Sequence, residues 1–228
     1  MNISTFVAAA AHDMKNSVSV IAAYLEAALA QLAEQGGEQS SEAALSTYQA
    51  LYETQRVNGN LVQLMAIFKL EEGMYPFQLT EVALDEFAEE VLERVRRLAR
   101  LKGLELLCEV EDDVPSWFFD HDLITSVVVQ SLFNSVRYAR ARVQLSMRVR
   151  DRQLEIEVAD DGPGFPDFML EQGFPSRQGI DVRTGSTGLG LFFSRMAADL
   201  HQRGDLRGST RLSNGGTLGG GSFVIVLP

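Results

Sequence analysis

Apolar side chains in the first 73 residues recur at alternating spacings of three and four, the period of an amphipathic α-helix. The first apolar stripe runs through Val7, Ala11, Met14, Val18, Ile21, Leu25, Ala28 and Leu32. Two glycines and a serine pair break the pattern over Gln35–Ser41, which favours a connection between helices. A second stripe predicts a helix over about Glu42–Glu72, interrupted by Asn58-Gly59-Asn60. The pattern therefore predicts a helical hairpin.

After a joint at Gly73–Pro76, amphipathic helices mix with alternating strands and short turns. The predicted helices span 84–101, 122–139 and 189–200, and the first of them is terminated by Gly103. The predicted strands span 104–111, 143–149, 154–158, 211–213 and 222–227. Asp151-Arg152 is expected to form the turn of a hairpin. This order predicts an α+β sandwich with one sheet and one helical layer. Two domains follow, 1–73 and 76–228.

A single pair of amphipathic helices buries too little apolar surface to be stable alone. Pairing two hairpins into a four-helix bundle solves this, so a homodimer through residues 1–73 is expected. The alternative is that the hairpin packs against the C-terminal domain of its own chain.

Composition narrows the functional classes. The net charge of −11 argues against a nucleic-acid surface, because phosphate binding needs clustered lysine and arginine. The single cysteine, Cys108, excludes an internal disulfide and indicates a reducing compartment. Its alternation with Leu106 and Val110 predicts a buried structural thiol. The sequence has no apolar run of roughly 18 residues and no signal peptide, so a cytoplasmic protein without membrane insertion is expected.

Two glycine-rich stretches carry the candidate chemistry. Asp160-Asp161-Gly162-Pro163-Gly164 follows an alternating strand, with Asp161 expected to face solvent, and Gly185–Leu191 opens a helical run. Glycines let the backbone approach a ligand closely, and free N–H groups at a helix start bind phosphate oxygens. With an Asn134-bearing helix ahead of both, they indicate a nucleotide pocket. The stretch from Phe165 to Thr187 lacks periodicity and is expected to be a functional lid, in which Arg177 and Arg183 are candidate triphosphate ligands.

These motifs resemble the ATP-binding domain of sensor histidine kinases, the GHKL-type fold shared with gyrase and MutL. The matching blocks, in chain order, are His12–Asn16 as the H box, Gln130–Tyr138 as the N box, Asp160, Gly162 and Gly164 as D-x-G-x-G, Gly188 and Gly190 as the second glycine box, and Gly221–Phe223 as the closing strand.

The resemblance implies roles for individual residues. Asn134 and Gln130 would ligate Mg²⁺, Arg137 and Tyr138 would lie near the phosphates, and Asp160 would accept a hydrogen bond from the adenine amino group. The remaining nucleotide contacts would come from Gly162, Gly164, Thr187, Gly188, Leu189 and Gly190.

Counting about 100° per residue places His12 about 130° around the first helix from the apolar stripe, on one outer face with Asn16. The resemblance makes His12 the phosphoacceptor, Asp13 its base, and Asn16 the residue that orients water for dephosphorylating a regulator. Ser17 stands where the family commonly has proline, which implies a weaker helix kink.

The sequence thus predicts a dimeric histidine kinase core that uses ATP and Mg²⁺ to phosphorylate His12. The phosphoryl group would pass to an aspartate on a response-regulator receiver domain. Two alternatives remain, an ATP-independent phosphotransfer adaptor and an ATP-gated protein-binding switch. Because eleven residues precede His12, either the chain is an excised catalytic core or sensing belongs to a separate polypeptide.

Overall fold

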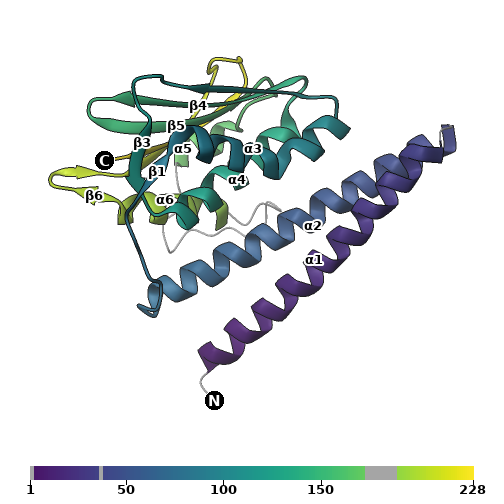
Figure 1. Ribbon diagram of the computed structural model, residues 1–228, viewed down its shortest axis with the longest axis horizontal. Helices are drawn as coiled ribbons and strands as arrows, with labels where there is room; N and C mark the ends of the chain where they lie inside the picture. Colours follow the sequence, from purple (N-terminus) through teal and green to yellow (C-terminus); the bar gives the residue numbers. More distant parts are fainter. Residues whose placement is uncertain (1–2, 36–37, 173–188) are drawn as a thin grey trace. The chain divides into compact units, whose positions relative to one another are not determined.

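The computed structural model describes residues 3–35, 38–172 and 189–228 (Figure 1). The chain divides into two compact units, Met1–Tyr75 and Pro76–Pro228. The first unit consists of two long helices, and the second combines a β-sheet with helices.

The helices of the first unit are α1 (Ile3–Gln35) and α2 (Glu38–Glu71), which pack along each other (Figure 1). Helix α2 begins four residues before the predicted start, so the serine pair Ser40-Ser41 lies in its first turn, where serine is well tolerated. It also continues through Asn58-Gly59-Asn60, because packing overrides a helix-propensity cost of about 1 kcal/mol per glycine. None of the described helices has an apolar stretch long enough to cross a bilayer.

The buried side of α1 differs from the predicted apolar stripe. Ala22 and Leu29, which are buried, each lie one residue after a position of that stripe. Met14 and Ile21, which belong to the predicted stripe, keep 56% and 51% of their surface exposed, and the neighbouring Tyr24 keeps 74%. Packing between α1 and α2 therefore leaves these apolar side chains uncovered.

Five strands of the second unit's described residues form its main sheet, in the order β2-β4-β5-β9-β8. These are β2 (Glu105–Val110), β4 (Arg142–Arg150), β5 (Gln153–Asp160), β9 (Gly221–Leu227) and β8 (Ser209–Asn214). Strands β2 and β4 are parallel, and the other neighbours are antiparallel. The helices α3 (Leu84–Leu101), α4 (His121–Tyr138) and α6 (Leu189–Leu200) cover one face, as the sequence predicts (Figure 1).

Two short strand pairings and one short helix lie outside the predicted pattern. Strand β1 (Thr80–Ala83) pairs with β3 (Ser116–Phe119), β6 (Gln202–Arg203) pairs with β7 (Leu206–Arg207), and α5 (Asp167–Gln172) forms the start of the expected lid. Elements of two to six residues are too short to show a hydrophobic period, so the sequence pattern does not reveal them.

Alternation along β5 separates the two faces of the sheet. Leu154, Ile156 and Val158 are buried on the helix side. On the other face Glu157 pairs with Arg148 at 2.6 Å and Glu155 pairs with Arg211 at 2.5 Å. The sheet therefore has an apolar face under the helices and an opposite face of charged side chains joined in pairs.

Cys108 corrects one expectation, because its thiol is exposed rather than buried. It lies on β2, an edge strand of the sheet that pairs only with β4 among the described strands. Alternation with Leu106 and Val110 shows that these residues share a strand face, but it does not show whether that face is covered. The position of the strand in the sheet decides burial.

A buried histidine joins α6 to the start of α4. The backbone N–H of Asp120 donates to Nε2 of His201 at 2.9 Å, and Nδ1 of His201 donates to the Ala197 carbonyl at 2.7 Å. The Asp120 carboxylate caps α4 by accepting from the Leu123 N–H at 3.0 Å. Burial lowers the pKa of His201, although the Ala197 carbonyl and Asp120 oppose the shift. These bonds require the neutral ring.

We expect the second unit to lose stability as the pH falls below about 6.5, the ordinary histidine pKa. The unfolded chain then binds a proton that folded His201 rejects, contributing up to about 1.4 kcal/mol per pH unit. Chemical unfolding followed by the fluorescence of Trp117, the single tryptophan, measures this at pH 7.5 and pH 5.5. In His201→Gln, whose amide does not titrate, the pH dependence should be shallower. Parallel curves for both proteins would contradict the assignment.

Candidate functional site

Asp160 ends β5 and forms the centre of the candidate site. Its side chain is buried, with 7% of the residue exposed. Oδ2 accepts from the Ser135 hydroxyl at 3.0 Å, and Oδ1 accepts from the backbone N–H of Gly162 at 2.8 Å and of Gly221 at 3.4 Å. A carboxylate out of water is tolerated only when it is hydrogen-bonded. Helix α4, the loop after β5 and the start of β9 therefore meet at this carboxylate.

The glycines around Asp160 are required by close backbone contact. A Cβ atom at Gly162 would lie 2.5 Å from the Tyr138 carbonyl oxygen, and one at Gly220 would lie 2.5 Å from the Asp160 carbonyl oxygen. Gly164 has a φ of 81°, which side chains rarely adopt, and its Cβ would meet the Asn214 amide at 2.6 Å. Larger residues at these positions would push the loop away from α4 and β9.

Asn214, at the end of β8, is a site residue that the sequence does not reveal. Its Oδ1 accepts from the Phe165 N–H at 2.7 Å, and its Nδ2 donates to the Phe165 carbonyl at 2.8 Å. This pair of bonds fastens the glycine loop to the β8–β9 hairpin. In the sequence, Asn214 before Gly215-Gly216 signals only a turn, because its partner lies 49 residues away.

Asp161 is a structural residue rather than a side chain that simply faces solvent. Its Oδ1 accepts from the backbone N–H of Arg140 at 2.8 Å and of Ala141 at 3.1 Å. Burial raises the pKa of Asp161, but the backbone hydrogen bonds at Ala141, Arg142 and Arg140 outweigh it and leave the pKa below its ordinary value. The ionised carboxylate therefore connects the loop to the chain between α4 and β4.

The candidate nucleotide ligands on α4 lie away from the core. Asn134 is exposed and Gln130 is half-buried, one helical turn earlier. Arg137 and Tyr138 are exposed at the end of the helix, with the guanidinium carbon 5.3 Å from the centre of the tyrosine ring. Asn134, Arg137 and Tyr138 can be reached from solvent, whereas Ser135 on the buried side of α4 donates to Asp160.

Lys102 holds the C-terminal end of α4 in place. Its Nζ donates to the carbonyl oxygens of Val136, Arg137 and Ala139 at 2.8, 2.5 and 3.1 Å. These are carbonyls that a helix end leaves without partners, and a cation there also favours the helix dipole. Burial lowers the pKa of Lys102, while Asp160 and Asp161 oppose the shift. The sequence shows only a lysine before Gly103, with no sign of this long-range contact.

Several predicted site residues have no described contact with the residues around Asp160. Thr187 and Gly188 lie outside the described residues, as do Arg177 and Arg183 of the expected lid. Leu189 and Gly190 open α6, where the Gly190 carbonyl accepts from the Ser194 hydroxyl at 2.8 Å. In the first unit His12, Asp13 and Asn16 all belong to α1. The Asn16 side chain is exposed, and the side chains of His12 and Asp13 lie outside the described residues.

The donor set fits a magnesium ion only when a nucleotide supplies part of the coordination. The described residues contain no group of three or more His, Cys, Asp or Glu that could hold a metal. The amide oxygens of Asn134 and Gln130 are oxygen ligands, which Mg²⁺ prefers, and this ion usually keeps waters and binds phosphate oxygens. The structure therefore suits a metal shared between protein and phosphates.

Most of the second unit matches the model of a known protein family. The family described as histidine kinase-, DNA gyrase B- and HSP90-like ATPase matches residues 119–228. Residues 119–228 are therefore similar to the ATPase domains of this family. The match includes α4, both sides of the Asp160 site and the closing strand β9, so the resemblance seen in the sequence motifs is confirmed for this part of the chain.

Full-length relatives extend the likeness to the helical unit. The adaptive-response sensory kinase SasA of Crocosphaera subtropica is 24% identical over 188 residues, which is 81% of this chain and 49% of the relative. The sensor-like histidine kinase SenX3 of Mycobacterium bovis is 26% identical over 233 residues, 98% of this chain and 53% of the relative. The chain thus spans about half the length of these sensor kinases.

Solved structures agree on the fold. Full-length ShkA, in complex with AMPPNP, has a TM-score of 0.62 at 19% identity and covers 98% of this chain and 45% of ShkA. The catalytic domain of the histidine kinase ThkA has a TM-score of 0.55 at 20% identity and covers 66% of this chain and 95% of that domain. The second unit therefore has the fold of a histidine kinase catalytic domain.

Proposed function

We propose that this chain is the kinase core of a two-component sensor, in which the ATPase domain binds ATP with Mg²⁺ and His12 receives the γ-phosphoryl group. The observation that carries the proposal is the buried Asp160 carboxylate, held by Ser135 and Gly162 within a domain of the histidine kinase-type ATPase family. The sensor kinases similar to the whole chain support the same conclusion.

Asp160 is suited to recognise adenine. An ionised carboxylate has about four acceptor positions, and Ser135, Gly162 and Gly221 use three. The remaining position would accept a hydrogen bond from the amino group of adenine. Guanine presents a carbonyl oxygen at the corresponding ring position, which an acceptor repels. The site should therefore prefer ATP to GTP.

The phosphates and metal would lie along α4 and at the start of α6. Asn134, with Gln130, would ligate Mg²⁺ through its amide oxygen. Arg137 would donate to phosphate oxygens through its forked guanidinium, with Tyr138 beside it. Gly162, Gly164 and the glycine box of Thr187, Gly188, Leu189 and Gly190 would let the backbone approach the nucleotide.

His12 would act as the nucleophile. One ring nitrogen of its neutral imidazole would attack the γ-phosphorus, a phosphorus–nitrogen bond would form, and the bond to the bridging oxygen would break to release ADP. Asp13 would accept the proton of the other ring nitrogen in a hydrogen bond and stabilise the cation that forms. An aspartate of a response regulator would then take the phosphoryl group. Asn16 would position the water that later dephosphorylates that regulator.

A second copy of the chain would cover the apolar surface of α1. Met14, Ile21 and Tyr24 are each more than half exposed in the single chain. Two hairpins that bring such surfaces together would form a four-helix bundle. The proposed homodimer also places two phosphoacceptor helices in one assembly, which receives its signal from a sensor domain or a separate sensor protein.

Replacing Asp160 by asparagine should weaken ATP binding by about 1.5–3 kcal/mol, the loss expected for a hydrogen bond to a charged group. The preference for ATP over GTP should shrink as well. Titration with both nucleotides measures the change. Glu157→Gln is a matched control, because it removes one buried charge from the same strand on the opposite face. Unchanged ATP affinity in Asp160→Asn would place the adenine pocket elsewhere.

His12→Gln should abolish autophosphorylation and leave ATP affinity unchanged. Incubation with γ-labelled ATP should label the wild type with acid-labile, base-stable phosphate, the behaviour of a phosphorus–nitrogen bond. Labelled phosphate on the variant would contradict the assignment of His12. ATP binding without any label on the wild type would favour a nucleotide-gated binding switch instead.

Ile21→Asp should dissociate the proposed homodimer, because a charge forced into an apolar interface costs several kcal/mol when unpaired. Ser19→Asp adds the same charge at an exposed position on the other side of α1 and should leave the dimer intact. Light scattering at tens of micromolar measures the mass. A monomeric wild type would refute the bundle.

A further inference from the structure

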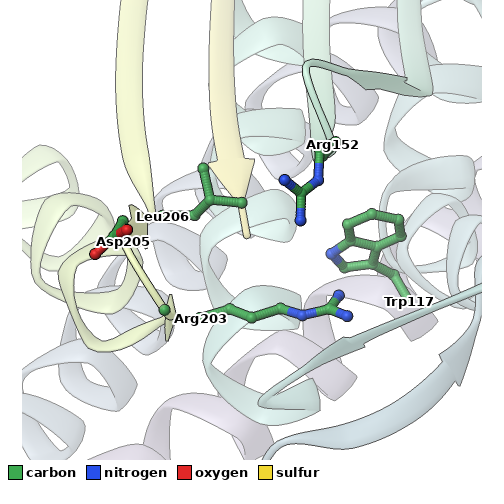
Figure 2. A pocket seen from close by; sticks show the side chains of 6 residues that line it. Trp117, Arg152, Arg203, Asp205 and Leu206 are labelled. Atoms are coloured by element: carbon green, nitrogen blue, oxygen red, sulfur yellow. The ribbon is translucent and has the colours of Figure 1, made fainter.

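The second unit has a hollow at the end of β5 opposite to Asp160. Its volume is about 570 Å³. The lining residues come from strand β3, the β4–β5 turn and the β6–β7 hairpin, and they are Trp117, Arg152, Arg203, Gly204, Asp205 and Leu206 (Figure 2). Strand β5 begins at Gln153 beside this hollow and ends at Asp160, so the hollow is separate from the candidate nucleotide site.

Two arginines extend into the hollow from different elements. Arg152 comes from the β4–β5 turn and Arg203 from β6, and their guanidinium groups lie to one side of the Trp117 ring (Figure 2). Within the described part of the chain, neither side chain has a hydrogen bond or ion pair. By contrast, three arginines of the main sheet, Arg148, Arg150 and Arg211, pair with glutamates. Two cations that face one space, neither in an ion pair among the described residues, favour an anion between them.

The backbone at Arg152 adds an independent reason. Arg152 has a φ of 66° and Asp151 a φ of 51°, both in the left-handed region. A two-residue hairpin turn of this kind prefers Asn-Gly or Asp-Gly, because glycine adopts positive φ without steric cost. A non-glycine residue in a strained conformation often marks a functional position. The turn therefore carries an arginine at a position where glycine would adopt the backbone conformation at lower steric cost.

The walls of the hollow indicate what kind of anion would fit. The Trp117 Nε1–H donates to the Pro228 carbonyl at 3.0 Å, which fixes the indole at the wall of the hollow. Leu206 adds an apolar side chain, and the Asp205 carboxylate lies apart from the guanidinium groups (Figure 2). The hollow thus combines two forked cationic donors with an aromatic wall.

We propose that this hollow binds a small aromatic anion, whose carboxylate groups or phosphate bridge Arg152 and Arg203 while its ring lies against Trp117. Guanidinium groups match the geometry of carboxylate and phosphate oxygens. A volume of about 570 Å³ lies within the range of small-molecule sites. The proposal does not depend on kinase activity, because it uses none of the residues assigned to ATP or to phosphotransfer.

Titration of the full chain with benzene-1,3,5-tricarboxylate tests this at constant ionic strength. Trp117 is the single tryptophan, so its fluorescence reports directly on the hollow, and calorimetry gives an independent dissociation constant. The wild type should show saturable binding that excess ADP does not displace. Inorganic phosphate, which lacks a ring, and benzyl alcohol, which lacks a charge, should each bind at least tenfold more weakly.

Two variants and one control separate binding from folding. Arg203→Ala and Arg152→Gly should each weaken the tricarboxylate at least tenfold, while Arg152→Gly should keep or raise the melting temperature because glycine accepts this backbone conformation. Arg94→Ala removes an equal charge from the exposed surface of α3 and should leave binding unchanged. The proposal is overturned by absence of saturable binding, by displacement with ADP, by phosphate binding as tightly as the tricarboxylate, or by equal losses in Arg94→Ala.

Discussion

The burial of one carboxylate organises the catalytic unit. Asp160 ends a strand inside the sandwich, where an ionised side chain needs donors because water is excluded. Ser135, Gly162 and Gly221 supply them from three separate segments. The glycines follow from the same constraint, since a Cβ at Gly162 or Gly220 would collide with the backbone that brings those donors close. Packing around Asp160 and the proposed recognition of adenine therefore depend on the same contacts.

Helix α4 presents the site because both of its ends are fixed by tertiary contacts. At its start, Asp120 caps the helix and its N–H bonds to buried His201 of the segment after α6. At its end, Lys102 binds three carbonyl oxygens. These contacts determine the position of Asn134 and Arg137 without touching a ligand themselves. Changes in either contact are expected to act on the nucleotide through the helix.

Strand β5 connects two chemically different ends of the unit. At one end a buried carboxylate lies among glycines, and at the other lie two arginines that form no ion pair within the described residues, beside an aromatic ring. The face of the sheet between them carries paired charges such as Arg148 and Glu157, which satisfy each other and offer little to a ligand. The two proposed ligand sites therefore lie at opposite ends of the strand.

Local pattern in the sequence determined the helices α3 and α6, the turn at Asp151-Arg152, the α+β class and the motif around Asp160, because each depends on neighbours within a few residues. Only the tertiary structure decided the roles of Asn214 and Lys102, whose partners lie 34 to 49 residues away. It also decided that Cys108 is exposed. Alternation shows which residues share a strand face, but the position of the strand in the sheet determines whether other elements cover that face. Periodicity records which residues share a surface, and long-range packing determines what that surface meets.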